Sequence, residues 1–190
     1  KGSEHLVKSV LNHVQAHRGR AQSAIDLVAK YDQAQASYQR HYAAVNGRHA
    51  TLYPGVLQGL DALRQTGIHL ACLTNKPTGF ARELLRLKGL DGFFSEVFGG
   101  DSFERKKPDP LPLLKTCQSL GTQPARTLMI GDSSNDARAA RAAGCPVLLV
   151  TYGYNHGEPV RAVDADGLVD SRAALAEWHW RKKADGIAPA

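Results

Sequence analysis

Two acidic residues follow a short apolar run in the stretch TLMIGDSSND, residues 127–136. Asp132 comes directly after the run and one glycine, and Asp136 lies about one helical turn further on. An aspartate at the end of a buried strand lies where the sheet meets water, and Mg²⁺ prefers such hard oxygen ligands. We therefore predict that Asp132 binds Mg²⁺ and that Asp136 supports it by holding a coordinated water. The alternative is that both acids only cap a helix and favour its dipole.

Polar side chains also follow other apolar runs. Thr74 and Asn75 follow HLACL, and they could donate to phosphoryl oxygens, together with the N–H groups of a helix beginning near Pro77. Lys107, before Pro108, could neutralise phosphate charge and keep the acids in place. The alternatives are an ordinary polar strand end and an exposed lysine. Because ligands of open α/β sheets bind outside the carboxyl ends of the strands, these residues together predict one phosphate-binding crevice.

The elements that must position these residues follow from the hydrophobic pattern. Two helical patterns occupy residues 5–45 and meet near AHRGRA; after them, short apolar runs alternate with helical patterns. Expected strands cover residues 68–74, 94–100, 126–131, 146–151 and 166–171. Expected helices cover residues 55–67, 79–89, 109–121, 134–144 and about 173–183, with glycines closing the first two. The alternation predicts an α/β, Rossmann-like fold, a parallel sheet with helices on both faces.

The connection between the apolar run and the acids has its own local chemistry. Gly131 would give the backbone room to turn, and Ser133 or Ser134 would cap the helix that follows.

The change of pattern near residue 53 divides the chain into a helical part, residues 1–52, and an α/β part, residues 53–190.

Composition restricts the possible partners. The 190 residues are 43% hydrophobic and 22% charged, which suits one domain or a core domain with a small insert. No apolar run is long enough to cross a membrane, and the net charge of +6 comes from scattered Lys and Arg without a nucleic-acid recognition motif. We therefore expect neither a membrane nor a nucleic-acid partner. The three cysteines lack metal-site spacing, which predicts free thiols in a reducing compartment: Cys72, Cys117 and Cys145.

Four stretches strongly resemble the haloacid dehalogenase superfamily and, within it, the phosphoglycolate phosphatase branch: LTNKP, KKPDPLPLL, MIGDSSNDARAARAAGCPVLLVTYGYNHGEP and YPGV. The resemblance covers nearly all of residues 53–172, with a looser similarity in the helices before it. It implies a haloacid dehalogenase-like core with residues 1–52 as part of a helical cap.

The resemblance also implies an activity and a set of site residues. The activity is that of a cytoplasmic, Mg²⁺-dependent phosphatase of carbohydrate metabolism, a monomer or homodimer, acting on a small phosphorylated acid such as 2-phosphoglycolate. Apart from the resemblance, His156 in the Gly-flanked stretch YGYNHG could contact substrate or act as an acid/base, the alternative being a surface turn. The roles implied by the motifs are phosphate binding by Thr74, Asn75 and Lys107, catalysis by Lys107 and Asp136, and metal binding by Asp132.

The first motif of the family, DxDGT, which carries the nucleophilic aspartate, does not occur in these 190 residues. The stretch DADGLVD, residues 164–170, comes after the fourth motif and follows no long apolar strand, so it does not replace it. We therefore expect the C-terminal majority of a phosphatase that lacks its first core strand and its nucleophile, and a chain that is inactive alone. The alternatives are a phosphatase or phosphomutase acting on sugar phosphates, a non-catalytic phosphate-binding module, and a receiver-like signalling domain.

Overall fold

The computed structural model describes residues 2–18, 24–155 and 157–170. The expected helix at residues 173–183 and the candidate His156 lie outside the described residues. The chain forms two compact units, Lys1–Thr51 and Leu52–Ala190.

The first unit is a pair of helices, α1 (Gly2–Arg18) and α2 (Ala24–Val45), which pack against each other. The ammonium of Lys8 on α1 lies 5.4 Å from the centre of the Tyr31 ring on α2. The side chains of Leu6, Val10 and Val14, spaced by four residues, remain exposed on one face of α1. The two expected helices are therefore present.

The second unit alternates helices with parallel strands, as predicted for an α/β fold. Its helices are α3 (Val56–Gln65), α4 (Thr78–Leu87), α5 (Leu111–Ser119) and α6 (Ser134–Ala143). Its strands are β1 (Ala71–Leu73), β2 (Glu96–Phe98), β3 (Met129–Gly131), β4 (Val147–Val150) and β5 (Gly167–Val169). Three short 3₁₀ turns complete it: η1 (Asp91–Phe93), η2 (Pro124–Arg126) and η3 (Val160–Ala162).

The ends of these elements follow local sequence chemistry. Gly67 and Gly89, at the ends of α3 and α4, have positive φ angles of 77° and 66°. Glycine adopts this conformation without steric cost, which is why both positions were expected to close helices. The strands are shorter than the apolar runs that predicted them, because the outer residues of each run lie in the connections.

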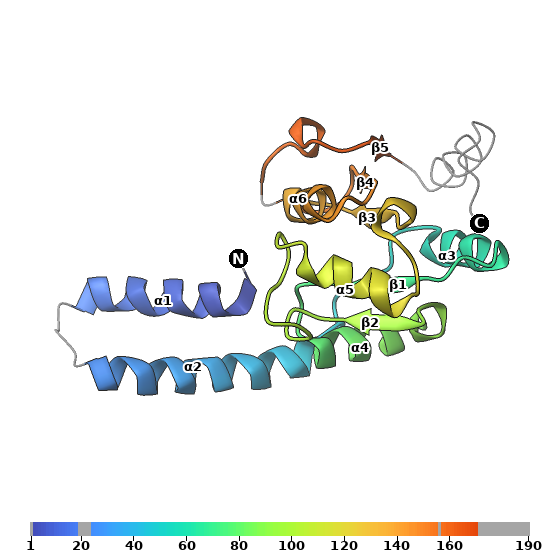
Figure 1. Cartoon of the computed structure of the whole chain (residues 1–190). Coiled ribbons are helices and arrows are strands. Elements are labelled where there is room, and N and C mark those ends of the chain that lie inside the picture. Colours follow the sequence, from blue (N-terminus) through green and yellow to red (C-terminus); the bar gives the residue numbers. More distant parts are fainter. Residues whose placement is uncertain (1, 19–23, 156, 171–190) are drawn as a thin grey trace. The chain divides into compact units, whose positions relative to one another are not determined.

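The described strands form two parallel sheets. Among the described residues, β1 pairs with β2 alone, with Cys72 opposite Val97, while β3, β4 and β5 form a second parallel sheet in that order. Helix α5 packs against β1 and β2, and α6 packs against β3 and β4. Because α5 and α6 also pack against each other, the helices join the two sheets (Figure 1).

The main apolar core lies around α5, α6 and β4. Its buried members are Leu113, Cys117, Met129, Ala137, Ala140, Ala143, Cys145, Val147 and Leu149. The first three residues of β4, Val147, Leu148 and Leu149, are all 0% exposed. In β3, beside it, Ile130 is 39% exposed. One of two neighbouring strands is therefore left partly uncovered.

Two expectations from composition can be compared with the structure. All three cysteines carry free thiols, as predicted, and the sulfur atoms of Cys117 and Cys145 lie 4.0 Å apart in the core. Burial and the neighbouring Cys117 raise the pKa of the Cys145 thiol to about 12.

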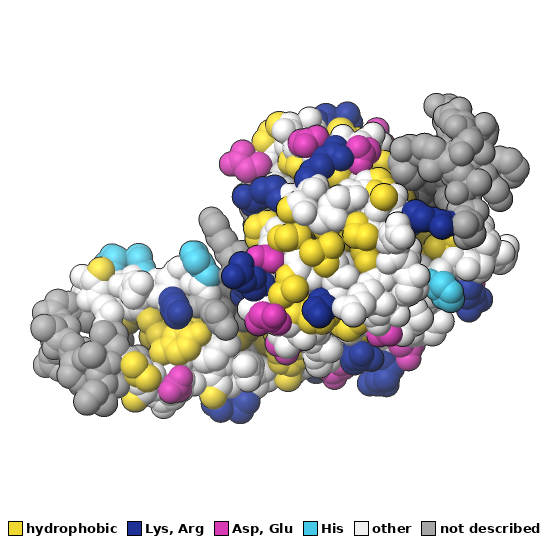
Figure 2. Space-filling model, in the orientation of Figure 1, with side chains coloured by type: hydrophobic (Ala, Val, Ile, Leu, Met, Phe, Trp, Pro, Cys, Tyr) yellow, Lys and Arg dark blue, Asp and Glu magenta, His cyan; other side chains and the backbone are white. Residues whose placement is uncertain are grey.

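Within the described part of the chain, no helix combines the length and apolar character needed to cross a bilayer. On the face drawn in Figure 2, Lys and Arg are scattered among acidic side chains.

Candidate active site

A buried ion pair connects the carboxyl ends of the two sheets. The ammonium nitrogen of Lys107 lies 2.8 Å from Oδ1 of Asp136, and their side chains are only 8% and 7% exposed. The same nitrogen donates to the carbonyl oxygen of Leu73, at 2.7 Å, where β1 ends. One lysine therefore brings together the end of β1 and the start of α6, which follows β3.

Both carboxylate oxygens of Asp136 have partners. Its Oδ2 accepts hydrogen bonds from the hydroxyl of Ser133 at 2.7 Å and from the N–H groups of Asp132 and Ser133 at 3.2 Å each. Ser133 and Asp136 form a capping box at the start of α6, so Ser133 is the N-cap. Burial alone would raise the pKa of Asp136, but the charge of Lys107 and these hydrogen bonds outweigh it and lower the pKa. The carboxylate is thus held ionised, and Asp136 also caps helix α6, while the Asp132 side chain takes no part in the capping box.

Glycine is required at position 131 for a different reason from the one expected. A Cβ at this position would lie less than 3.0 Å from the Asp136 side chain, closer than real Cβ atoms approach. The φ of Gly131 is not in the left-handed region, so the turn itself does not require glycine. The residue makes space for the Asp136 carboxylate.

The side chain of Asn75 holds the backbone of Lys107. Its Nδ2 donates to the Lys107 carbonyl at 2.8 Å, and its Oδ1 accepts from the Lys107 N–H at 3.1 Å. Thr74, the preceding residue, accepts from the N–H of Lys76 at 3.2 Å, which leaves its hydroxyl hydrogen able to donate to a ligand. Phosphate binding by the two residues stays a prediction, and the contacts give the Asn75 side chain a positioning role.

The first turn of α4 is capped by a residue from a distant loop. The N–H of Thr78 donates to Oδ1 of Asp101 at 2.7 Å, and the Thr78 hydroxyl donates to the same oxygen. A Cβ at Gly99 or Gly100 would lie less than 3.0 Å from backbone atoms of this turn or of Asn75. The expectation that this helix end offers its N–H groups to phosphate is therefore wrong for Thr78, whose N–H is already used. Sequence reasoning missed Asp101 as a cap because it lies 23 residues from its partner.

The contribution of Asp101 to stability should depend on pH. Hydrogen bonds from the hydroxyl and the N–H of Thr78 lower its pKa. The carboxylate therefore contributes stability above the ordinary carboxyl pKa of about 3.9, and the contribution is lost as the pH falls through the lowered pKa. The difference in unfolding free energy between wild type and Asp101→Ala should shrink over this acid range, as measured by urea unfolding at each pH.

The Thr78→Val background provides the control for this prediction. One donor to Asp101 is missing there, so the pH-dependent difference caused by Asp101→Ala should be smaller. A difference that is the same at every pH in the wild-type background would contradict the prediction.

Asp132 lies beside this network but is used differently. Its backbone N–H donates to Asp136, while its own Oδ2 accepts from the N–H of Tyr154 at 3.0 Å. The carboxylate is partly exposed at the end of β3. The described residues contain no cluster of three or more His, Cys, Asp or Glu that could hold a metal. A single carboxylate nevertheless fits Mg²⁺, which takes one or two carboxylates and completes its shell with water and phosphate oxygens.

Asp164 and Asp166, the first two acids of the DADGLVD stretch, lie at the amino ends of the strands. Arg141 donates to Asp164 at 3.0 Å and to Asp166 at 2.8 Å, and Asp166 accepts from the N–H of Val147, the first residue of β4. Parallel strands place their amino ends at one edge, so these acids lie opposite the edge that carries Asp132. Their structural role agrees with the expectation that this stretch does not replace the DxDGT motif.

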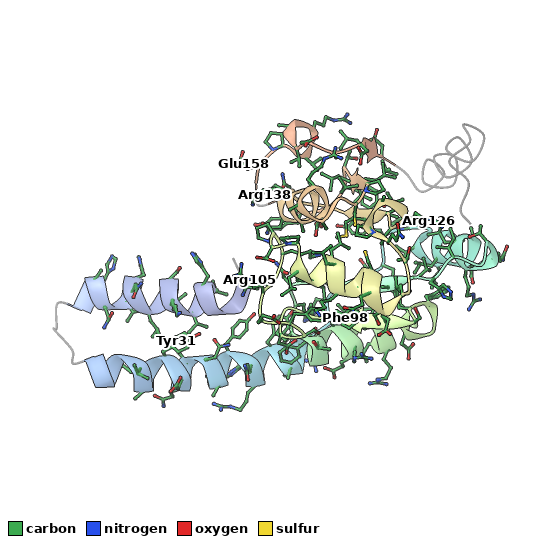
Figure 3. All side chains as sticks on the ribbon, viewed as in Figure 1. Tyr31, Phe98, Arg105, Arg126, Arg138 and Glu158 are labelled. Carbon is green, nitrogen blue, oxygen red and sulfur yellow. The ribbon has the colours of Figure 1, made fainter. Side chains whose placement is uncertain are left out.

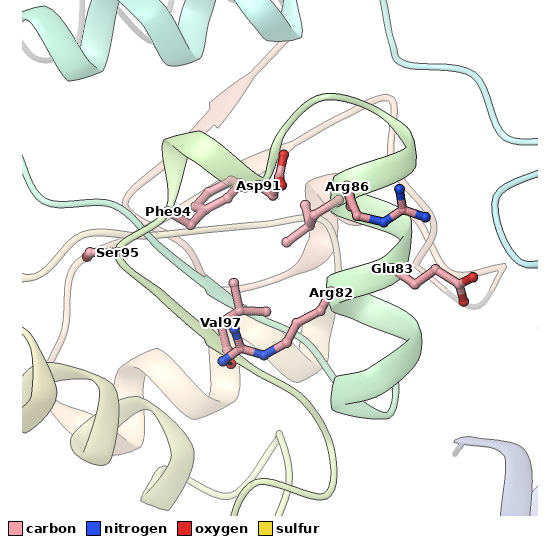
Figure 4. A pocket seen from close by; sticks show the side chains of 8 residues that line it. Arg82, Glu83, Arg86, Asp91, Phe94, Ser95 and Val97 are labelled. Carbon is pink, nitrogen blue, oxygen red and sulfur yellow. Dashed lines mark hydrogen bonds between the residues drawn. The ribbon is translucent and has the colours of Figure 1, made fainter.

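A shallow cavity lies elsewhere on the unit. It has a volume of about 400 Å³ and lies between α4 and the segment leading through β2 (Figure 4). Its lining residues are Arg82, Glu83, Leu85, Arg86, Asp91, Phe94, Ser95 and Val97. None of the predicted site residues lines it, so the candidate site is the group at the strand ends.

Comparison with known sequences finds one matching family model and relatives that share one name. A family model described as "Haloacid dehalogenase-like hydrolase" matches residues 8–150. The chain is 49% identical over 148 residues to a phosphoglycolate phosphatase of Thiobacillus denitrificans, covering 78% of this chain and 65% of that protein. It is 44% identical over 176 residues to a plasmid-encoded phosphoglycolate phosphatase of Cupriavidus necator, covering 92% and 72%. The chain thus spans slightly less than two thirds of the first relative's length.

Solved structures agree with the sequence relatives. A crystal structure described as a predicted phosphoglycolate phosphatase from Haemophilus somnus superposes with a TM-score of 0.84 at 31% identity, covering 94% of this chain and 77% of that one. A haloacid dehalogenase-like hydrolase from Streptococcus pneumoniae superposes with a TM-score of 0.68 at 22% identity, covering 87% and 75%. The second likeness concerns the fold alone.

Proposed function

Because the chain belongs to the haloacid dehalogenase-like hydrolase family, we propose that it is the larger part of a Mg²⁺-dependent phosphatase acting on a small phosphorylated acid. The names of the most similar relatives favour 2-phosphoglycolate, hydrolysed to glycolate and phosphate. The observation that carries the proposal is the Lys107 ammonium, 2.7 Å from the end of β1 and 2.8 Å from Asp136 after β3. It gives one cation, fixed in position, at the edge where α/β proteins bind ligands.

Each residue of the group has a proposed task. Lys107 attracts the phosphoryl oxygens and offsets the charge that develops on them during transfer. Asp136 and Asn75 position Lys107, and the Thr74 hydroxyl donates to a phosphoryl oxygen. Asp132 would hold Mg²⁺, which when bound supplies further neutralisation of phosphate charge.

The nucleophile is proposed to come from outside these 190 residues. Phosphoryl transfer through a covalent intermediate needs a carboxylate in line with the leaving oxygen. Asp136 is engaged by Lys107, and Asp132 is assigned to the cation. An aspartate on a further strand would attack phosphorus and displace the alcohol oxygen of the substrate, and water would then hydrolyse the aspartyl-phosphate to release phosphate.

The edges of the two sheets support a further strand. Among the described residues, no strand pairs with β1 on the side away from β2, or with β3 on the side away from β4. Ile130 of β3 is 39% exposed although Leu148 and Leu149 of the adjacent β4 are fully buried. A parallel strand inserted between β1 and β3 would pair both edges, cover Ile130 and end beside Lys107.

An activity assay tests the proposal. The 190-residue chain with Mg²⁺ and 2-phosphoglycolate should release no phosphate above the blank. Fusing to Lys1 the N-terminal segment of the Thiobacillus denitrificans relative that precedes the matched region should produce turnover. In the fused chain, Lys107→Met should lower kcat by about 10²–10³-fold, since it removes a fixed charge that stabilises the transition state.

The outcomes separate the alternatives. Robust turnover by the 190-residue chain alone would refute the external nucleophile. A folded fused chain that prefers sugar phosphates in a substrate panel would change the substrate class. A folded fused chain that binds phosphate but hydrolyses nothing would favour a non-catalytic binding module. The free thiols of all three cysteines favour a reducing, cytoplasmic location for this phosphatase.

A further inference from the structure

The loop after β4 lies against the acid at the end of β3. Tyr154 donates its N–H to Oδ2 of Asp132, at 3.0 Å, across 22 residues of sequence. Gly153, beside it, approaches the same side chain so closely that an added Cβ would lie less than 3.0 Å from three of its atoms. The φ of Gly153 is not in the left-handed region, so the requirement for glycine here is space.

Asn155 attaches this loop to the start of α6. Its side chain is buried, at 6% exposure, and its Oδ1 accepts from the N–H of Ser134 at 2.8 Å. Its Nδ2 donates to the carbonyl of Glu158 at 3.1 Å, and the Glu158 N–H donates back to its carbonyl at 2.8 Å. Glu158 is labelled in Figure 3, close to α6. Both polar atoms of the Asn155 side chain are therefore used to fix the loop at the first turn of the helix.

These contacts restrict the Asp132 carboxylate from two sides. Ser133, the residue after Asp132, begins the capping box of α6, and Asn155 binds the next residue, Ser134. On the other side, Gly153 permits close approach, and Tyr154 donates to one of the two carboxylate oxygens. With Oδ2 accepting from the backbone, Oδ1 is the oxygen left to bind a cation.

We propose that Gly153 and Asn155 are positioning residues that orient Asp132 for a divalent cation. The inference deepens the proposed function and rests on it, because it takes Asp132 as the metal ligand. Residues that orient metal ligands typically change metal affinity by about 10–100-fold when they are replaced. Gly153 and Asn155, in the stretch that was read from sequence as a surface turn or a substrate contact, thereby gain a role in building the metal site.

Cation affinity of the 190-residue chain tests the proposal without any need for turnover. Mn²⁺, a probe for Mg²⁺, is titrated while the electron paramagnetic resonance signal of the free ion is followed, under conditions in which circular dichroism shows every variant folded. Gly153→Ala and Asn155→Ala should each weaken Mn²⁺ binding by about 10–100-fold. Asp132→Asn should abolish binding at this site.

Matched controls separate positioning from general destabilisation. Gly79→Ala adds a methyl group where nothing lies within 4 Å, and it should leave Mn²⁺ affinity unchanged. Thr116→Val removes a buried hydroxyl that donates to the Pro112 carbonyl in α5, so it should lower stability but not Mn²⁺ affinity.

The possible results have distinct meanings. If Mn²⁺ binds through Asp132 and the folded Gly153 and Asn155 variants bind it as tightly as wild type, the positioning proposal is overturned while the proposed function stands. If the unsubstituted chain shows no binding that depends on Asp132, the metal assignment in the proposed function fails, and the positioning proposal fails with it. If Thr116→Val weakens binding as much as Asn155→Ala, the effect is one of stability, and the proposal is again overturned.

Discussion

Replacing Asp136 by Asn should lower the free energy of unfolding by about 3–5 kcal/mol, because it leaves the buried Lys107 ammonium without its counter-charge. The Lys107 side chain is only 8% exposed. Besides the ion pair, its ammonium donates a hydrogen bond to the Leu73 carbonyl, which carries no full charge. A neutral amide keeps the shape of the carboxylate but supplies no negative charge. Urea unfolding at neutral pH, followed by circular dichroism, gives the measurement.

Two further variants make this prediction specific. Asp61→Asn breaks an exposed ion pair with Arg64 in the same unit and should cost less than about 1 kcal/mol. The double variant Lys107→Met/Asp136→Asn should be more stable than Asp136→Asn alone, since no unpaired ammonium remains buried. If Asp136→Asn cost no more than Asp61→Asn, the pair would not be buried in solution as it is in the structure.

Replacing Leu149 by Ala should be the most damaging truncation in the core, with a loss of about 2–5 kcal/mol of unfolding free energy. Leu149 is 0% exposed at the centre of β4 and packs in the cluster between α5 and α6. Removing its side chain loses the transfer free energy of the buried carbons and leaves a cavity that the surrounding helices can only partly fill. The same unfolding experiment measures the loss.

Ile130→Ala is the matched comparison on the adjacent strand. Because Ile130 is 39% exposed, its truncation should cost clearly less than that of Leu149 in the 190-residue chain. In the chain fused to the relative's N-terminal segment, the cost of Ile130→Ala should rise, since the proposed strand would cover this side chain. Equal costs of Ile130→Ala in both chains would argue against a strand at that edge.

Local features of the fold could be predicted because they depend on neighbouring residues. The ends of α3 and α4 were expected at Gly67 and Gly89, where only glycine adopts the required backbone conformation easily. Ser133 or Ser134 was expected as the N-cap of α6, and Ser133 takes this role; the hydrogen bonds of this helix start join residues within four positions of each other. Which strands pair with each other could not be predicted, because strand pairing is set by segments far apart in the sequence.

The candidate site also contains residues that could be proposed from the sequence and contacts that could not. Lys107, Asp132 and Asp136 could be proposed from their positions after apolar runs, and the structure brings Lys107 and Asp136 into contact and places Asp132 beside them. The capping role of Asp101 and the loop contact of Tyr154 with Asp132 could not be proposed, because each joins residues more than 20 positions apart.

The sequence by itself determined the order of helices and parallel strands and the polar residues that end those strands, since periodicity and turn chemistry act over a few residues. Only the tertiary structure decided which of those polar groups remain available to a ligand. Asn75 hydrogen-bonds the Lys107 backbone and Asp136 the Lys107 ammonium, while Asp132 accepts from the N–H of Tyr154 and remains partly exposed. The physical reason is that a buried polar group must find a partner, and packing of distant segments determines which partner it finds.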